Sequence, residues 1–143
     1  MSYLDGVLAL AGVGVGFGLT LINDLFREKR RYRKTKSALF EEISQIQFIL
    51  KTNAIEFNKD SYQVGDKLLP FITMAYQSLK TDLALILDSR ELFAVNLAYR
   101  QVEKLNEVSS ITHHEDGLVL RVFKKDEVDL ACSLIVIALA ILK

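Results

Sequence analysis

The chain has 143 residues, a formal net charge of zero, one cysteine and one proline, and half of its residues are apolar. Zero net charge excludes a chain-wide basic field for nucleic acid, and a single cysteine excludes an intramolecular disulfide. Proline occurs only at position 70, and most glycines lie in the first 18 residues. This composition predicts an all-α protein.

The first predicted element is an uncharged helix over residues 6–23, flanked by Asp5 and Asp24. A helix of this length spans about 27 Å, close to the hydrocarbon thickness of a bilayer. We expect a transmembrane anchor within a first segment, residues 1–26. The alternative is a buried helix of a soluble protein.

A basic juxtamembrane segment follows at residues 27–36, where seven of ten side chains are Lys or Arg. No Lys or Arg precedes the anchor, so the positive-inside rule predicts a plasma-membrane protein with its N-terminus outside and its C-terminal domain cytoplasmic. A cleaved signal peptide has the opposite charge order. We expect contacts with lipid head groups rather than nucleic acid, because no nucleic-acid motif surrounds the segment. The six side chains assigned to this contact are Arg27, Lys29, Arg30, Arg31, Arg33 and Lys34.

The anchor contains a glycine ladder with the pattern GVGVGFG, formed by Gly12, Gly14, Gly16 and Gly18. A phosphate-binding loop is excluded because G-x-G-x-x-G is absent. On a helix the ladder forms two G-x-x-x-G faces, the spacing that lets transmembrane helices approach closely. Over about seven residues it resembles the glycine-rich inner helix of ATP-synthase c-rings. The chain lacks the second hairpin helix with its carboxylate, so only packing against other membrane helices, including copies of itself, is expected.

Residues 37–143 are predicted to form a cytoplasmic bundle of about four helices. No Gly or Pro lies between Gly18 and Gly65, so we expect the anchor helix to continue into the first of these. Its apolar positions recur at steps of 3 and 4. They are Leu39, Ile43, Ile46, Leu50, Ala54 and Phe57, widened by Phe40, Phe48, Ile49 and Ile55. Residues 57–67 are predicted to be a loop.

Pro70 suits a first helical turn, and residues 70–87 predict one helix or two short ones with a break at 80–82. Asp88 and Glu91 have the spacing of an N-terminal cap for the next helix, which we expect to reach residue 110. Its apolar positions are Leu92, Val95, Tyr99, Val102 and Leu105.

Residues 112–117, THHEDG, are predicted to form a turn. Adjacent histidines do not share a helix face and no further His exists, so we expect no metal site. Residues 118–123 are assigned to a helix, because a lone strand would lack a partner. Residues 130–142 are uncharged but short for a membrane span. Burial in the bundle or an oligomer contact is favoured over membrane insertion, and Cys132 within this run is expected to be a small packing residue.

An N-terminal anchor, a basic stretch, the helix LFEEISQIQFIL and the later motif YRQVEKLN together resemble small prokaryotic single-pass membrane proteins without a defined activity. The resemblance implies architecture only. No nucleophile–base set, carboxylate pair or metal spacing points to an enzyme, a cofactor or a small-molecule substrate. We therefore predict a non-enzymatic membrane protein that self-associates or docks onto a larger membrane complex. The alternative is a membrane-perturbing or pore-forming effector, of the toxin or anti-phage defence type, acting through oligomerised anchor helices.

Overall fold

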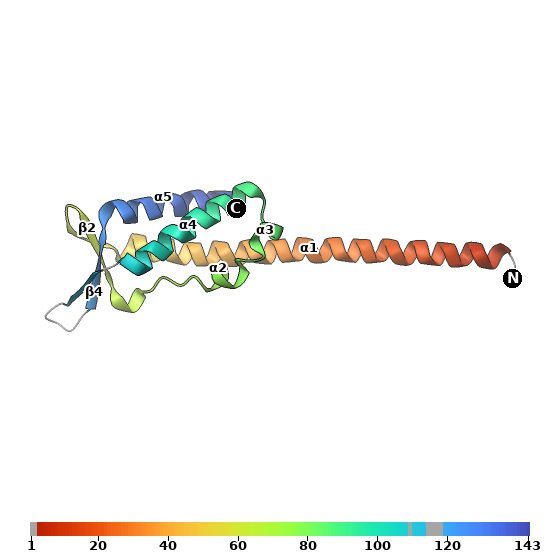
Figure 1. The fold of residues 1–143 in the computed structure, drawn as a ribbon, viewed down its shortest axis with the longest axis horizontal. Coiled ribbons are helices and arrows are strands. Elements are labelled where there is room, and N and C mark those ends of the chain that lie inside the picture. Colours follow the sequence, from red (N-terminus) through yellow and green to blue (C-terminus); the bar gives the residue numbers. More distant parts are fainter. Residues whose placement is uncertain (1–2, 109, 114–118) are drawn as a thin grey trace. The chain divides into compact units, whose positions relative to one another are not determined.

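A computed structural model describes the backbone of residues 3–108, 110–113 and 119–143, and side chains from Gly12 to Glu107 and from Val119 onward. The chain divides into two compact units, Met1–Lys34 and Thr35–Lys143. The first unit is helical over its described residues. The second contains the hydrophobic core, three long helical segments, two short helices and a small sheet (Figure 1).

Helix α1 (Tyr3–Asn53) continues without a break through the basic segment, as predicted. Within the second unit its apolar stripe of Leu39, Ile43, Ile46 and Leu50 is buried, as the 3–4 spacing predicts. The helix ends at Asn53, so the last predicted stripe residue, Phe57, falls in a strand and is exposed. The widening of the stripe is also partly wrong, since Phe48 and Ile55 are exposed while Phe40 and Ile49 are half-buried.

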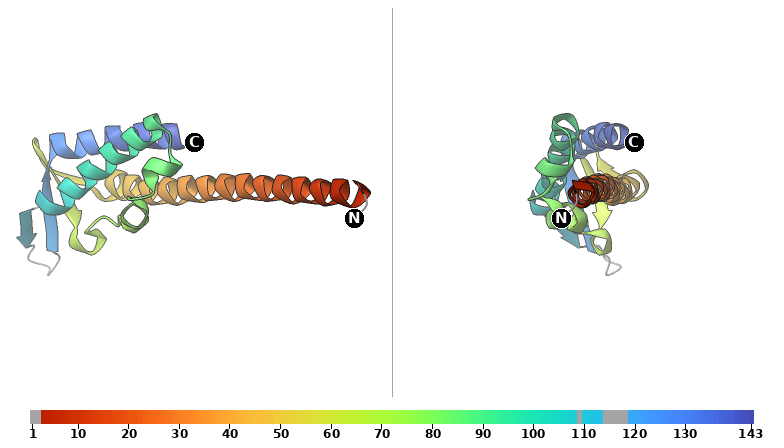
Figure 2. Two further views of the ribbon diagram at one scale, coloured as in Figure 1. Left: turned by 45° about the vertical axis from the view of Figure 1, so that its right-hand side comes forward. Right: turned by 90° about the vertical axis from the view of Figure 1, so that its right-hand side faces the viewer.

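Helices α4 (Ser89–Val108) and α5 (Lys125–Leu142) lie side by side in the second unit, as both Figure 1 and Figure 2 show. Four of the five predicted core residues of α4 are buried and Leu92 is half-buried. Helix α5 buries one face at the same 3–4 spacing. Its buried residues are Val128, Ala131, Ile135, Ala138 and Leu142. The predicted burial of residues 130–142 is therefore confirmed for one face of this helix.

Two short helices, α2 (Met74–Leu79) and α3 (Leu83–Ile86), connect the sheet to α4, with the predicted break between them at residues 80–82. Pro70 does not start a helix, contrary to the prediction. It follows a cis peptide bond, and the chain stays non-helical until Met74. The segment is nevertheless anchored, because Phe71, Tyr76 and Leu83 are buried in the core.

A four-stranded antiparallel sheet corrects the all-α prediction. Its order is β1 (Ile55–Asn58), β2 (Ser61–Gly65), β4 (Val119–Lys124), β3 (Ser110–His113). Residues 57–67 are therefore mainly a hairpin followed by the 3₁₀ turn η1 (Asp66–Leu68), and residues 119–124 are a strand rather than a helix. Strand β4 finds its partner β2 about 60 positions earlier, with Tyr62 opposite Phe123. A pattern of neighbouring residues cannot reveal a partner strand so far away in the sequence. The tendency of a segment to form a strand nevertheless depends on that partner.

Candidate functional site: an exposed apolar and basic helix segment

The described part of the first unit is a helical segment whose apolar side chains are all exposed. Their exposed fractions range from 49% at Leu21 to 71% at Val13. The full set is Val13, Val15, Phe17, Leu19, Leu21, Ile22, Leu25 and Phe26. These residues include neighbours in sequence, so they occupy several sides of the helix. Contiguous exposed apolar surface of this kind marks an interaction site with lipid or protein.

The glycine ladder lies in the same segment. A Cβ built on Gly12, Gly14, Gly16 or Gly18 meets no atom within 4 Å. Within this helix the hydroxyl of Thr20 donates a hydrogen bond to the carbonyl of Gly16 at 3.0 Å. The small residues are therefore not needed for close packing among the described residues of the chain. Their predicted packing role stays a prediction about other molecules.

All six side chains assigned to lipid head groups are exposed. They are Arg27, Lys29, Arg30, Arg31, Arg33 and Lys34. The seventh basic residue, Lys36, belongs to the second unit and behaves differently, since its ammonium lies 2.8 Å from a carboxylate oxygen of Glu91. Six of the seven basic side chains are thus exposed, whereas the seventh, Lys36, forms an ion pair within the second unit.

Over the described residues, no helix combines enough length and enough apolar character for a membrane crossing. Residues 6–11 of the predicted anchor have side chains outside the described part. The finding therefore concerns the remainder of that segment, from Gly12 onward, which runs directly into Asp24 and the basic side chains.

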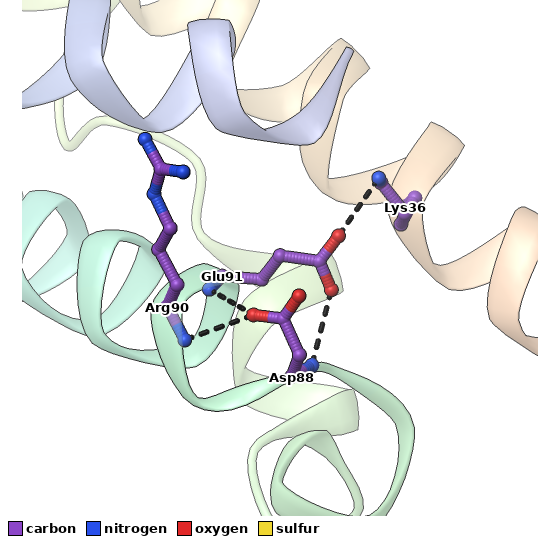
Figure 3. A network of polar contacts seen from close by, with 4 residues as sticks. All are labelled: Lys36, Asp88, Arg90 and Glu91. Carbon is purple, nitrogen blue, oxygen red and sulfur yellow. Dashed lines mark hydrogen bonds and ion pairs between the residues drawn. The ribbon is translucent and has the colours of Figure 1, made fainter.

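Figure 3 shows how Lys36 is held in the second unit. The carboxylate of Asp88 accepts the backbone N–H groups of Arg90 and Glu91, both at 2.8 Å, and Glu91 in turn accepts the N–H of Asp88 at 3.1 Å. This reciprocal arrangement is the predicted N-terminal cap of α4. Glu91 is buried, and its second oxygen accepts Lys36. The carboxylate of Glu91 therefore takes part in the N-terminal cap of α4 and also links α4 to α1 through the ion pair with Lys36.

A second buried carboxylate, Glu42, was not singled out by the sequence. Its oxygens accept the backbone N–H groups of Ala75 at 2.7 Å and Tyr76 at 3.2 Å, and the hydroxyl of Tyr99 at 2.6 Å. The accepted N–H groups belong to the first turn of α2, where a helix leaves its donors unpaired. Glu42 thus provides from α1 the cap that Thr73, which makes no side-chain cap bond, does not supply.

The two tyrosines of this cluster stack with their ring centroids 4.1 Å apart, and the hydroxyl of Tyr76 donates to Asn96 at 2.9 Å. Burial, followed by the hydrogen bond and negative charge of Glu42, raises the pKa of Tyr99 far above its ordinary value. Burial and the charge of Glu103 raise the pKa of Tyr76 as well. Both hydroxyls stay protonated at neutral pH and act as donors. The sequence signal for this cluster was a single glutamate, Glu42, between the apolar stripe residues Leu39 and Ile43.

Asn106 forms a comparable lock on the segment before α2. Its amide oxygen accepts the N–H of Phe71 at 2.8 Å, and its amide nitrogen donates to the carbonyl of the same residue at 3.2 Å. Both backbone groups of Phe71 are thereby satisfied where no regular secondary structure pairs them. The ring of Phe71 packs near that of Phe123, with centroids 6.3 Å apart.

The remaining candidates for a reactive or metal-binding site are Cys132 and residues 112–117. Burial, and secondarily the charge of Asp129, raises the pKa of Cys132, which keeps the half-buried thiol protonated at neutral pH. Thr112 and His113, from the predicted turn, have backbone in β3, whereas His114, Glu115 and Asp116 lie outside the described residues. Among the described side chains, no group of three metal-ligating residues gathers.

The described residues of the second unit line at least two hollows. One, of about 550 Å³, is lined by charges of both signs near the start of α5, including Lys59, Lys124 and Asp129. The other is an open groove of about 330 Å³ between α1 and α5. Comparisons with protein-family models, with curated proteins and with solved structures found no match to this chain.

Proposed function

We propose that this chain is a non-enzymatic membrane protein, held in the bilayer by one helix near residues 6–23, whose helical domain takes part in assembly by self-association or docking onto a membrane complex. The observation that carries the proposal is the apolar segment of the first unit. Its side chains from Val13 to Phe26 are all exposed in the chain itself, so another phase or another molecule must cover them.

Lipid is the covering that best suits this segment. Residues 6–23 carry no charge and match the hydrocarbon thickness, and six exposed cations follow within residues 27–34. Each Lys or Arg near an anionic surface contributes about 1 kcal/mol to membrane binding. The charge order supports a cytoplasmic position for the second unit. Because the described residues alone do not make up a span, the proposal depends on residues 6–11 extending the apolar run.

A structural role for the second unit is supported by how its polar groups are used. The buried carboxylates of Glu42 and Glu91 hold helices α2 and α4 in place, with donors on both oxygens of each. Each carboxylate is thereby committed to backbone and side-chain partners within the fold. We expect such a domain to be rigid and to bind its partners through its surface.

Membrane extraction of the full-length chain tests the anchor. After expression, membranes are washed with alkaline carbonate, and the wild-type chain is expected to stay in the pellet. Replacing Val15 and Leu19 together by Arg adds about 5 to 7 kcal/mol to the free energy of insertion, so the variant is expected in the supernatant. The matched control is Leu85→Arg, an exposed apolar residue of the second unit. Extraction of the wild-type chain, or equal retention of the double variant, refutes the anchor.

Labelling with a membrane-impermeant maleimide tests the orientation. In a Cys132→Ser background, a cysteine at Ser2 is expected to react from outside right-side-out vesicles, whereas one at Ser37 reacts only after permeabilisation. Replacing Arg30, Arg31 and Arg33 by Gln removes three of the seven Lys and Arg side chains that flank the anchor and is expected to give mixed labelling. Labelling of Ser37→Cys from outside, in the Cys132→Ser chain that keeps all its arginines, contradicts the orientation.

A membrane-perturbing effector is the second candidate, favoured by the open surroundings of the glycine ladder. Since a Cβ at Gly16 meets nothing within 4 Å, Gly16→Leu leaves the chain's own packing intact and reports only on contacts with other molecules. If the anchors oligomerise to perturb the bilayer, expression of the wild-type chain dissipates the membrane potential and Gly16→Leu abolishes that effect. An unchanged potential on expression contradicts this candidate.

A further inference from the structure

The outward face of α5 is apolar although its inward face already fills the core. Val136, Ile137 and Leu130 are about half exposed, and no charged residue occurs from Leu130 to Leu142. Most surface helices have polar outer faces, so a helix that is apolar on both sides normally has a second partner. We propose that this face binds the same face of a second copy of the chain, with the two α5 helices antiparallel. The inference rests on the proposed function, because it identifies one surface used for self-association.

The order of side chains along the exposed stripe supports an antiparallel pair. The stripe runs Leu130, Ser133, Ile137, Ala140, and all four are exposed at helical steps of 3 and 4. Large and small residues alternate. Reversing the second helix about a two-fold axis near residue 135 sets Leu130 of one copy opposite Ala140 of the other, and Ser133 opposite Ile137. Each large side chain then faces a small one, which is the condition for close packing in an isologous contact.

Charge at the two ends of the stripe favours the same arrangement. Asp126 lies exposed at its N-terminal end, and the exposed Lys143 lies just beyond its C-terminal end. The same antiparallel pairing brings Asp126 of each copy near Lys143 of the other. A parallel pair would instead place like charges together at both ends. Electrostatic complementarity therefore selects both the partner, a second copy, and the direction of its helix.

The groove between α1 and α5 continues the stripe on one side. Its lining includes Ser44 and Gln47 from α1 and Val136 and Ala140 from α5. Ala140 thus belongs to both the stripe and the groove. Ser44 on one wall and Ala140 on the other are small and leave room for a side chain of the second copy, so the contact extends beyond a single pair of helix faces.

Disulfide crosslinking between two tagged full-length copies tests the register. In a Cys132→Ser background, Leu130→Cys in one copy and Ala140→Cys in the other are expected to form a disulfide, as are Ser133→Cys and Ile137→Cys. Two copies of Leu130→Cys are not, because their positions lie about 15 Å apart along the pair. Crosslinking between two Leu130→Cys copies, or none between Leu130→Cys and Ala140→Cys, overturns the proposal.

Substitutions test the energetics in the same full-length chain. Ile137→Asp is expected to weaken self-association at least 10-fold, whereas Phe93→Asp, at a similarly exposed apolar position on α4, changes it less than twofold. Asp126→Lys and Lys143→Asp are each expected to weaken association about threefold to tenfold, and their combination restores it. Failure of the restoration, or association unchanged by Ile137→Asp, overturns the antiparallel contact.

Carbonate extraction of Ile137→Asp separates this inference from the proposed function. Retention in the membrane together with loss of self-association supports both. If the wild-type chain is monomeric in the membrane, or is found only with a different protein on this face, the α5 contact is wrong while the anchor stands. If carbonate extracts the wild-type chain while the Leu130→Cys and Ala140→Cys copies still form their disulfide, the anchor is wrong while the contact stands.

Discussion

Removing the hydroxyl of Tyr99 tests whether the buried carboxylate of Glu42 fastens α2 to the core. Tyr99→Phe keeps the ring that stacks on Tyr76 at 4.1 Å but deletes the 2.6 Å hydrogen bond to Glu42. A hydrogen bond to a charged group contributes about 1.5 to 3 kcal/mol. The carboxylate oxygen that loses this donor retains only the longer contact to the N–H of Tyr76 at 3.2 Å. We therefore expect a loss of about 2 kcal/mol in the free energy of unfolding.

For a domain of about 100 residues this loss corresponds to a fall in Tm of roughly 8 °C. Thermal and urea unfolding of the full chain, followed by circular dichroism, measure both quantities. The matched control is Tyr62→Phe. Tyr62 is a half-buried tyrosine on β2 whose hydroxyl makes no hydrogen bond to a described residue, so we expect a change within about 0.5 kcal/mol. If the two variants unfold alike, the Glu42 contact does not stabilise α2 and the reasoning is refuted.

The raised pKa of Tyr99 gives the same experiment a pH dependence. Above the ordinary tyrosine pKa of 10, the unfolded chain releases a proton that the folded chain retains, so stability falls as pH rises. The contribution of Tyr99 is complete below pH 10 and declines by about 1.4 kcal/mol per pH unit above it. Tyr99→Phe is expected to remove this part of the slope. The raised pKa of Tyr76 leaves a pH dependence of its own in the variant.

Three further outcomes follow from the polar contacts of the second unit. Asn106→Ala removes both hydrogen bonds to Phe71, so we expect a loss of about 2 kcal/mol and faster hydrogen exchange at the Phe71 amide. Glu91→Ala removes the buried carboxylate that lies 2.8 Å from the ammonium of Lys36 and part of the α4 cap, so we expect a loss of about 2 to 4 kcal/mol in urea unfolding. The raised pKa of Cys132 predicts slow reaction with iodoacetamide at pH 7.5, and a marked acceleration on unfolding in urea.

Each of these outcomes has a control on the same chain. Glu107→Ala, at an exposed position beside Asn106, is expected to change stability by less than about 0.5 kcal/mol. Asp88→Ala removes the cap but keeps the Lys36–Glu91 ion pair, and is expected to cost about 1 kcal/mol. Equal losses for Asp88→Ala and Glu91→Ala contradict a stabilising Lys36 pair. A thiol that reacts equally fast in the folded and unfolded chain contradicts the effect of burial on Cys132.

The helical part of the fold was largely predictable. Apolar residues at steps of 3 and 4 located the buried faces of α1 and α4, and the Asp88–Glu91 spacing located the start of α4. The break between α2 and α3 was also anticipated. These features depend on residues within one or two helical turns of each other, so the local pattern contains the information needed.

The sequence alone therefore determined the buried stripes of α1 and α4 and the division of charge between an uncharged N-terminal run and the basic segment after it. Only the tertiary structure decided the sheet, because β2 and β4 pair across about 60 residues and neither has a distinctive alternation by itself. It also decided the roles of Glu42 and Lys36, whose partners lie on other helices. Local periodicity records which face of an element is buried, whereas pairing between distant elements depends on a geometry that exists only once the chain has folded.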